Sequence, residues 1–217
     1  LLGTQCSSYK KVPAFSSKVK TVDTLFVMHP LLNLHCMGTK SDKAVNDSAL
    51  MESIQLTITG TYKKVLTGEY VLHTSRQPHT RPDSMTLELL LPLLKTMEKS
   101  KKRLANIPID PRLLNDSAAQ CSRYLLFTYM EGGYRSRATI TRRQAATISL
   151  TAASVLLGGP AIIMGQDSNC RLFQYLYDQK EKRVLLFYES LKCTDDLWQK
   201  TTTEHLAKTA CRKLYYK

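Results

Sequence analysis

The sequence has 217 residues, which suits one domain, or one domain with an appendage, better than two full domains. Hydrophobic residues make up 43% and charged residues 23%, which is close to the average for soluble globular proteins. This composition excludes general disorder, collagen-like repeats and a membrane protein with many spans. The 31 Lys+Arg against 18 Asp+Glu give a net charge of +13, which indicates an anionic neighbour: nucleic acid, lipid headgroups or an acidic partner.

The first residues combine two leucines and small residues with a cysteine and then two lysines. They read Leu1-Leu2-Gly3-Thr4-Gln5-Cys6-Ser7-Ser8-Tyr9-Lys10-Lys11. Gly3 stands three places before Cys6, and Gln5 takes the place of the small residue usual directly before it. The segment resembles the tail of a secretory signal running into the lipidation site of bacterial lipoproteins, and its continuation to Pro13 resembles the mature start of envelope lipoproteins of the Bacteroidetes. The resemblance implies that Cys6 carries a lipid anchor, with the apolar core of the signal upstream of Leu1.

Residues 7–22 are polar, rich in lysine and contain Pro13, which is typical of a tether between an anchor and a folded body. We therefore divide the chain into two parts. Residues 1–22 form a signal remnant, lipidation site and tether, and residues 23–217 form a single α/β domain with an apolar segment at 144–166.

The first half of the domain alternates strand and helix patterns. The short apolar run Thr24–Met28 predicts a strand that ends at His29-Pro30. Apolar residues at spacings of three and four predict a helix from Asp47 to Gly68, followed by a short strand over 70–73. A leucine-rich helix is predicted over 83–104, which Pro92 should kink or divide. Asp110-Pro111 then predicts a further helix start.

The second half begins with the clearest strand pattern in the chain, over 123–130, which we expect to end at Gly132-Gly133. The runs 170–177 and 183–189 predict two strands joined by a hairpin loop over the polar residues 178–182. A last helix is predicted over 195–216, with Asp195-Asp196 as its N-terminal cap. This order predicts a small mixed sheet layered with helices, of the α/β or α+β class, with a C-terminal β-hairpin followed by a helix.

Residues 144–166 carry no charge and follow Arg142-Arg143. Three interpretations are open for this segment. We favour a buried helix that ends at Gly158 and packs on the sheet. The alternatives are a membrane-inserting element of an assembled pore, because residues 147–152 alternate polar and apolar, and a single transmembrane helix, because about 20 apolar residues can span a bilayer.

No motif for an enzyme stands out. The glycine-rich nucleotide loops, the nucleophile elbow of serine hydrolases and the zinc-protease helix are not in the sequence. His73 and His79 lie near Asp83 in a polar turn, which is typical of solvated side chains, and Asp178 sits where aspartate favours a turn. The cysteines besides Cys6 (Cys36, Cys121, Cys170, Cys193 and Cys211) lack zinc spacing, and we expect buried thiols without a structural disulfide. We therefore expect no enzyme activity, no metal and no cofactor.

Basic residues are dispersed along the chain. Candidate contacts with an anionic surface are Lys99, Lys101, Lys102, Arg103, Arg142 and Arg143. Because no recognition helix or RNA-binding aromatic motif accompanies them, we do not expect nucleic acid as the partner.

The stretch from Leu113 to the C-terminus carries a family resemblance. A helix leads into the strand over 123–130, and the pair Leu172-Phe173-Gln174-Tyr175-Leu176-Tyr177-Asp178 and Val184-Leu185-Leu186-Phe187-Tyr188 precedes a final helix. This order is similar to the periplasmic lipoproteins related to the curli-secretion lipoprotein, the amino-terminal domain of TolB and the auxiliary lipoproteins of envelope ABC transporters. The family has no defining catalytic residues, so Cys6 alone carries over, as the lipid site.

The sequence thus predicts a non-enzymatic, lipid-anchored protein on the periplasmic side of the bacterial outer membrane. Its expected role is partner binding or assembly, as an accessory of secretion or transport, with an envelope protein or further copies of itself as partner. The alternative is a soluble basic module that binds nucleic acid or an acidic protein.

Overall fold

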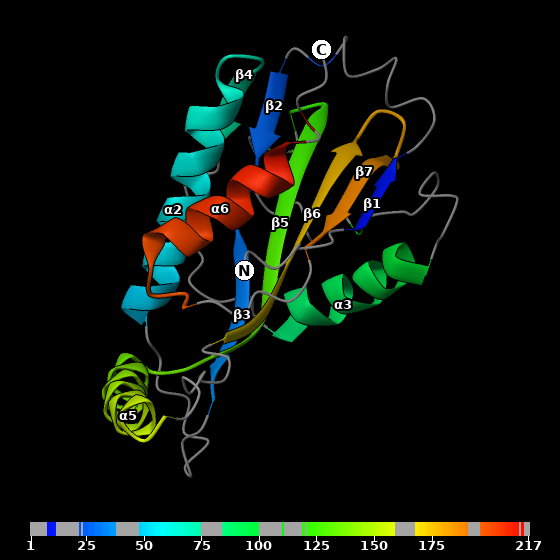
Figure 1. The fold of residues 1–217 in the computed structure, drawn as a ribbon. Coiled ribbons are helices and arrows are strands. Elements are labelled where there is room, and N and C mark those ends of the chain that lie inside the picture. Colours follow the sequence, from blue (N-terminus) through cyan, green and yellow to red (C-terminus); the bar gives the residue numbers. More distant parts are fainter. Residues whose placement is uncertain are drawn as a thin grey trace.

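A computed structural model describes residues 8–11, 22, 24–37, 48–74, 84–99, 110, 119, 121–158, 168–190, 196–212 and 214. They build one seven-stranded mixed sheet in the order β1-β7-β6-β5-β2-β4, with β3 also beside β5 (Figure 1). The strands are β1 (Ser8–Lys11), β2 (Thr24–Val27), β3 (Leu31–Cys36), β4 (Val71–Thr74), β5 (Tyr124–Tyr134), β6 (Ser168–Asp178) and β7 (Arg183–Glu189). The described helices are α2 (Ser48–Leu66), α3 (Ser84–Lys99), α5 (Arg137–Leu156) and α6 (Lys200–Cys211).

The long strand β5 organises the sheet. It pairs in parallel with β2 through its first half and with β3 through its second half, and it pairs with β6 antiparallel along its whole length. The strands β6, β7 and β1 continue the antiparallel side, and β4 extends the parallel side beyond β2.

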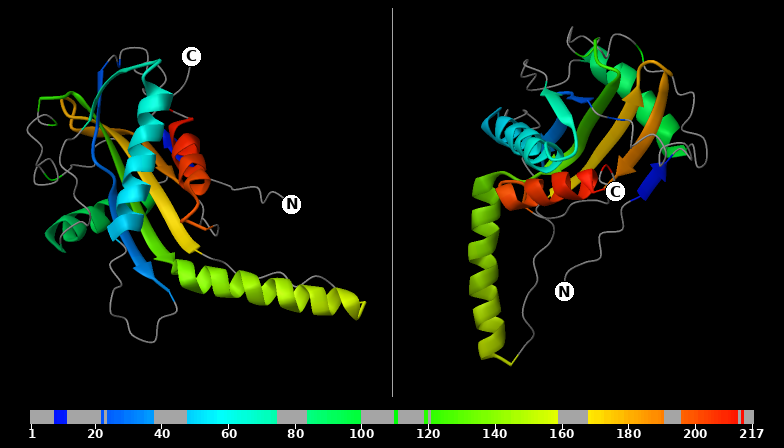
Figure 2. Two further views of the ribbon diagram at one scale, coloured as in Figure 1. Left: turned by 90° about the vertical axis from the view of Figure 1, so that its left-hand side faces the viewer. Right: turned by 90° about the horizontal axis from the view of Figure 1, so that it is seen from above.

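Helices cover both faces of the sheet. The pair α2 and α6 lies on one face and α3 on the other (Figure 2). Along β5, Leu126 and Met130 point into the core under α2 and α6, while Leu125, Phe127 and Tyr129 belong to the core under α3. Two covered faces explain why 124–130 is apolar without alternation, as in strands buried on both sides.

The predicted fold class is confirmed: a mixed sheet layered with helices ends in the hairpin of β6 and β7, followed by α6. The helix predicted after Asp47 is α2, whose buried side chains include Ile54, Ile58 and Tyr62. The helix start predicted at Asp110-Pro111 lies, apart from Asp110, outside the described residues.

In two places the sheet contains more strand than the sequence predicts. After His29-Pro30, where the first predicted strand ends, the chain forms a further strand, β3. The strand β5 also continues through Gly132-Gly133 to Tyr134. At Gly132, φ is +134°, and a Cβ atom would lie 2.1 Å from the backbone oxygen of Asn169, so glycine permits this close crossing of β6.

Two helix predictions hold only in part. Of the two effects predicted for Pro92, a kink or a division of the helix, division does not occur, because α3 runs from Ser84 to Lys99 through it. The last helix, α6, begins at Lys200 with Gln199 as its N-cap. Asp196 is therefore not the cap; its side chain accepts the backbone N–H of Trp198 at 2.9 Å in the turn before the helix.

Four residues of the predicted tether take part in the sheet. β1 lies within 1–22 and pairs antiparallel with β7, with Ser8 opposite Glu189 and Lys11 opposite Leu186. The N-terminal segment is thus joined to the domain at β1.

Candidate interaction surface

A helical arm, α5 with its C-terminal turn (137–158), projects from the lower end of the sheet (Figure 2). Its base is fixed. The Ser136 hydroxyl caps the helix by accepting the Thr139 N–H at 3.3 Å, and the Trp198 indole N–H donates to the Arg135 carbonyl at 3.0 Å. Ile140 is buried, with 4% of its surface exposed. These contacts hold the first turn and leave the rest of the arm extended from the domain.

In the remainder of the α5 arm, every side chain is exposed or half-buried. The structure describes all 20 residues of α5, and Ile140 is the one that is buried. Its large aliphatic side chains are Ile148 (71% exposed), Leu150 (54%), Val155 (59%) and Leu156 (87%), with Leu157 (88%) directly after it. From Gln144 to Gly158 no side chain is charged. By contrast, the solvent sides of α2 and α6 carry Glu52, Lys63, Lys64, Lys200 and Lys208.

The favoured interpretation of 144–166 is therefore wrong in one respect. The segment begins as a helix that stops before Gly158, where φ is +73°, but this helix does not pack on the sheet. The large aliphatic residues from Ile148 to Leu157 belong to an external surface rather than to the core, and 159–166 lie outside the described residues. Among the described residues, no helix has the length and hydropathy that a membrane span requires.

Four residues of the arm point away from its half-buried side. At about 100° per residue, Ala145, Ser149, Ala152 and Leu156 lie opposite the half-buried Thr147, Thr151 and Ser154. We call these four residues the outward strip. Ile148 and Val155 border it on one side, and Ala146 and Ala153 on the other.

The sequence of the arm repeats with a period of seven, a signal that our sequence analysis missed. Residues 144–150 read QAATISL and residues 151–157 read TAASVLL. Five of seven positions are identical or closely similar: Ala145 and Ala152, Ala146 and Ala153, Thr147 and Ser154, Ile148 and Val155, and Leu150 and Leu157. A seven-residue period is the spacing of helices that pair along their length.

The predicted anionic-surface residues do not gather in one place in the described part of the chain. Arg142 is exposed and Arg143 half-buried, both near the base of the α5 arm. Lys99 is the last residue of α3, which lies apart from α5 in every view (Figures 1 and 2). Lys101, Lys102, Arg103 and the predicted lipidation site Cys6 lie outside the described residues.

A polar depression lies on the α3 side of the sheet, beyond the apolar core. It has a volume of about 370 Å³ and is lined by Asn33, His35, Glu131, Gly132, Asn169 and Arg171. The register of β3, β5 and β6 places Asn33, Glu131 and Arg171 in one row. Their polar groups are occupied by neighbours. The Tyr129 hydroxyl donates to Glu131 at 3.2 Å and accepts from Asn33 at 3.3 Å, and Arg171 pairs with Glu189 at 3.4 Å. Burial raises the pKa of Tyr129, so it remains a neutral donor.

A second depression, of about 430 Å³, lies between α2 and the start of α6. Its lining comprises Ala49, Glu52, Ser53, Leu56, Thr57 and Lys200. Leu56 is 64% exposed there. The lining of this depression combines one large aliphatic side chain, Leu56, with a negative and a positive side chain, Glu52 and Lys200. It therefore resembles an ordinary solvated surface more than the α5 arm does.

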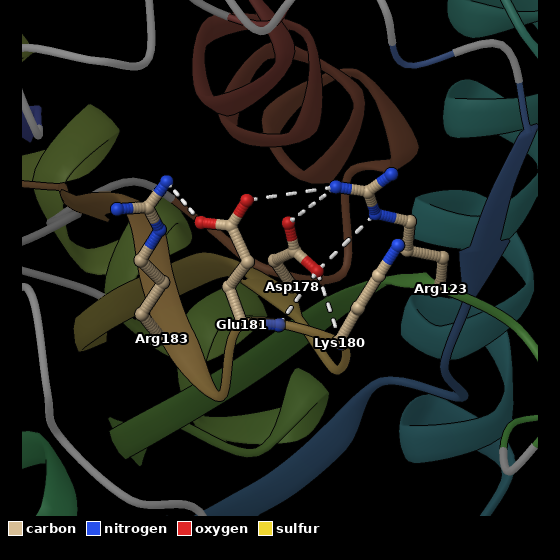
Figure 3. A network of polar contacts seen from close by, with 5 residues as sticks. All are labelled: Arg123, Asp178, Lys180, Glu181 and Arg183. Atoms are coloured by element: carbon tan, nitrogen blue, oxygen red, sulfur yellow. Dashed lines mark hydrogen bonds and ion pairs between the residues drawn. The ribbon is translucent and has the colours of Figure 1, made fainter.

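The residues considered for chemistry have structural roles where they are described. Asp178 is buried, and its carboxylate accepts the N–H groups of Lys180 and Glu181 at 3.0 and 3.2 Å, as expected of a turn residue (Figure 3). It also accepts from the Arg123 guanidinium at 3.2 and 3.4 Å. This carboxylate raises the pKa of Arg123. His73 is exposed on β4, and His79 and Asp83 lie outside the described residues.

The cysteines of the described residues are thiols. Cys211 is buried, which raises its pKa, and the Cys170 thiol donates to the Gly133 carbonyl at 3.2 Å. Cys36 is half-buried and Cys121 exposed. Among the described residues, no three His, Cys, Asp or Glu side chains are grouped to hold a metal ion.

No protein-family model matches the chain, and no curated protein matches it. Two similar solved structures are the PelC dodecamer from Paraburkholderia phytofirmans and a single-residue variant of it. The first has 12% sequence identity and a TM-score of 0.44, and the match covers 99% of each chain. The second has 10% identity and a TM-score of 0.43, and covers 97% of this chain and 99% of the other.

Proposed function

We propose that the protein is a non-enzymatic, lipid-anchored protein of the bacterial envelope that binds a partner or assembles with itself, as an accessory of secretion or transport. The α5 arm is its association surface, Cys6 is its lipid site, and the outer membrane, on the periplasmic side, is its location. The alternative for a chain of net charge +13 is a soluble basic module that binds nucleic acid or an acidic protein.

The single observation behind the association role is the exposure of the α5 arm. A helix that stays in water normally carries charge on its outer side, as α2 and α6 do here. The α5 arm instead exposes five large aliphatic side chains between Ile148 and Leu157 with no charge among them. Covering each such side chain contributes roughly 1.5–3 kcal/mol, so contact with another apolar surface is strongly favoured.

Anchoring at the membrane is supported by the sequence around Cys6 and by the net charge. A lipid chain contributes roughly 0.8 kcal/mol per buried CH2 group, and one chain alone binds only marginally. Basic residues near the anchor, including Lys10 and Lys11, add attraction to anionic headgroups.

Expression of the gene with its native upstream region tests the proposal. We expect the protein in the membrane fraction, with an intact mass that fits a chain beginning at Cys6 plus acyl groups. The Cys6→Ser variant should appear in the soluble fraction without that mass.

An unmodified mass in the soluble fraction would overturn the lipid anchor. The alternative would then be tested by retention on immobilised DNA and RNA at rising salt, because contacts with phosphates release counterions and weaken steeply as salt increases.

A further inference from the structure

We infer that the α5 arm pairs with the α5 arm of a second copy of this chain, as two antiparallel helices related by a two-fold axis. The inference rests on the proposed association function and names the partner that the arm contacts. The outward strip forms the seam between the two helices, and the two copies use the same residues.

The repeat of the arm defines this seam. In the seven-residue period, the outward strip supplies the inner positions, with spacings of four, three and four from Ala145 to Leu156. The half-buried Thr147 and Ser154 take the outer position of the repeat, on the side facing away from a second helix. The outward strip therefore has the spacing of the repeat; Ala145 and Ala152 occupy one of its two positions with the same residue, and Ser149 and Leu156 occupy the other with different residues.

The small residues of the strip suit close packing of helix against helix. In the antiparallel register, Leu156 lies opposite Ala145 of the second copy, and Ser149 lies opposite Ala152. Leu156, the one large side chain of the strip, thus meets a small residue, and Ser149 and Ala152 form a pair of small residues. Ile148 and Val155, which border the strip on one side, face Ile148 and Val155 of the second copy. The pairing therefore also covers these aliphatic side chains next to the seam.

The charges of the arm select the antiparallel direction. Arg137, Arg142 and Arg143 lie toward the N-terminus of α5, its first turn has no acidic residue, and its last turn has no basic residue. This is the reverse of what the helix dipole favours. An antiparallel second helix places Arg142 beside the negative C-terminal end of its neighbour, whereas a parallel one would bring like charges together.

Two hydroxyl groups of the arm, those of Thr147 and Ser149, are already satisfied within the helix. Thr147 donates to the Arg143 carbonyl at 2.8 Å and Ser149 to the Ala145 carbonyl at 3.1 Å. Because Ser149 keeps this bond when it is covered, its place in the seam costs little desolvation energy.

A matched pair of variants tests the seam in the full mature chain. Leu156 and Leu157 are neighbours with nearly equal exposure, 87% and 88%, but Leu156 lies in the outward strip and Leu157 about 100° away. By sedimentation velocity over a concentration series, we expect Leu156→Asn to weaken dimerisation at least about tenfold, and Leu157→Asn to change it by much less.

A second matched pair repeats the test with charge. Ala145→Glu places a carboxylate in the seam, and Gln144→Glu places the same group one residue away and outside it. We expect loss of the dimer only with Ala145→Glu. Circular dichroism at the same concentrations verifies that each variant is folded.

Crosslinking tests the direction of pairing. Ala145→Cys and Leu156→Cys proteins are mixed, treated with a short bismaleimide, and mapped by mass spectrometry of tryptic peptides. An antiparallel pair joins position 145 of one copy to position 156 of the other, and a parallel pair joins like positions.

A monomer at all concentrations, equal effects of Leu156→Asn and Leu157→Asn, or crosslinks between like positions would overturn the inference. Equal loss of binding to vesicles of anionic phospholipid by both leucine variants would instead identify the arm as a membrane contact. Each of these results leaves the Cys6-dependent mass and fractionation unaffected, so failure of the pairing is distinguishable from failure of the proposed function.

Discussion

Two buried tyrosines of the sheet and its covering helix differ in the state of their hydroxyl groups. The Tyr62 hydroxyl bonds the Thr128 hydroxyl at 3.0 Å, whereas the buried Tyr175 hydroxyl finds no hydrogen-bond partner among the described residues. Tyr175 stacks on Phe127 with ring centroids 4.6 Å apart. The contribution of Tyr175 to stability therefore comes mainly from the packing of its ring rather than from its hydroxyl group.

Replacing each tyrosine by phenylalanine should therefore give opposite results. Tyr62→Phe leaves Thr128 without its partner and should lower the free energy of unfolding by about 1 kcal/mol. Tyr175→Phe removes a buried hydroxyl with no partner and should leave that free energy unchanged or raise it. Urea unfolding at pH 7 measures both, and a loss above about 1 kcal/mol with Tyr175→Phe would contradict this assignment.

Asp178 fixes the turn between β6 and β7 by accepting two backbone N–H groups from a fully buried position. Asp178→Ala should lower the free energy of unfolding by about 2–4 kcal/mol, because these donors lose their acceptor. Asp178→Asn keeps one acceptor oxygen and should lose less. Thermal unfolding of the two variants measures the difference, and equal losses would show that the charge rather than the turn is the main contribution.

At the scale of elements, the α5 arm has a buried base and an exposed remainder. Ile140→Ala should lower the free energy of unfolding by about 2–4 kcal/mol, because its side chain is buried. Ile148→Ala, at a 71% exposed site, should change the free energy of unfolding by less than about 0.5 kcal/mol in the monomer. Denaturant unfolding at low protein concentration compares them, and similar losses would place the arm against the domain.

The elements that sequence reasoning predicted best are those whose local pattern matches their final surroundings. The helix α2 and the hairpin of β6 and β7 have such patterns, with the turn marked by Asp178. The strand β3 was missed because Pro30 suggested an end, whereas the pairing with β5 that defines it is distant in sequence. At Gly132, the close crossing by Asn169 that requires glycine is likewise a tertiary contact.

The α5 arm shows why the association surface was less predictable than the fold. An uncharged run of residues predicts burial, but the sequence does not say whether the chain itself or another molecule provides the cover. The residues of the polar depression come from three separate strands and have no common local signal.

For the whole molecule, the buried acidic groups predict instability at alkaline pH. Burial raises the pKa values of Tyr62, Tyr129, Tyr175 and Cys211 above their ordinary values of 10.0 for tyrosine and 9.0 for cysteine. Above those values the unfolded chain loses protons that the folded chain keeps. The unfolded state then binds fewer protons, so the free energy of unfolding falls as pH rises.

We therefore expect the free energy of unfolding to be constant near pH 8, to decline above pH 9 through Cys211, and to decline more steeply above pH 10 through the tyrosines, by up to about 1.4 kcal/mol per pH unit for each group. Urea unfolding from pH 8 to 11, with tyrosinate absorbance recorded in parallel, measures this decline. Tyr175→Phe should make the decline shallower, and an identical slope in the variant would contradict the contribution of Tyr175.

The strand β1 also limits how a lipid-bound form of the molecule can move. Cys6 precedes Ser8 by two residues, and two residues reach at most about 7 Å. With a lipid on Cys6, the membrane surface would meet the domain at the outer edge of the sheet rather than at the end of a long leash. Such a molecule would stay close to the bilayer, so neighbouring copies would present their projecting helices at a similar height and search for one another in two dimensions.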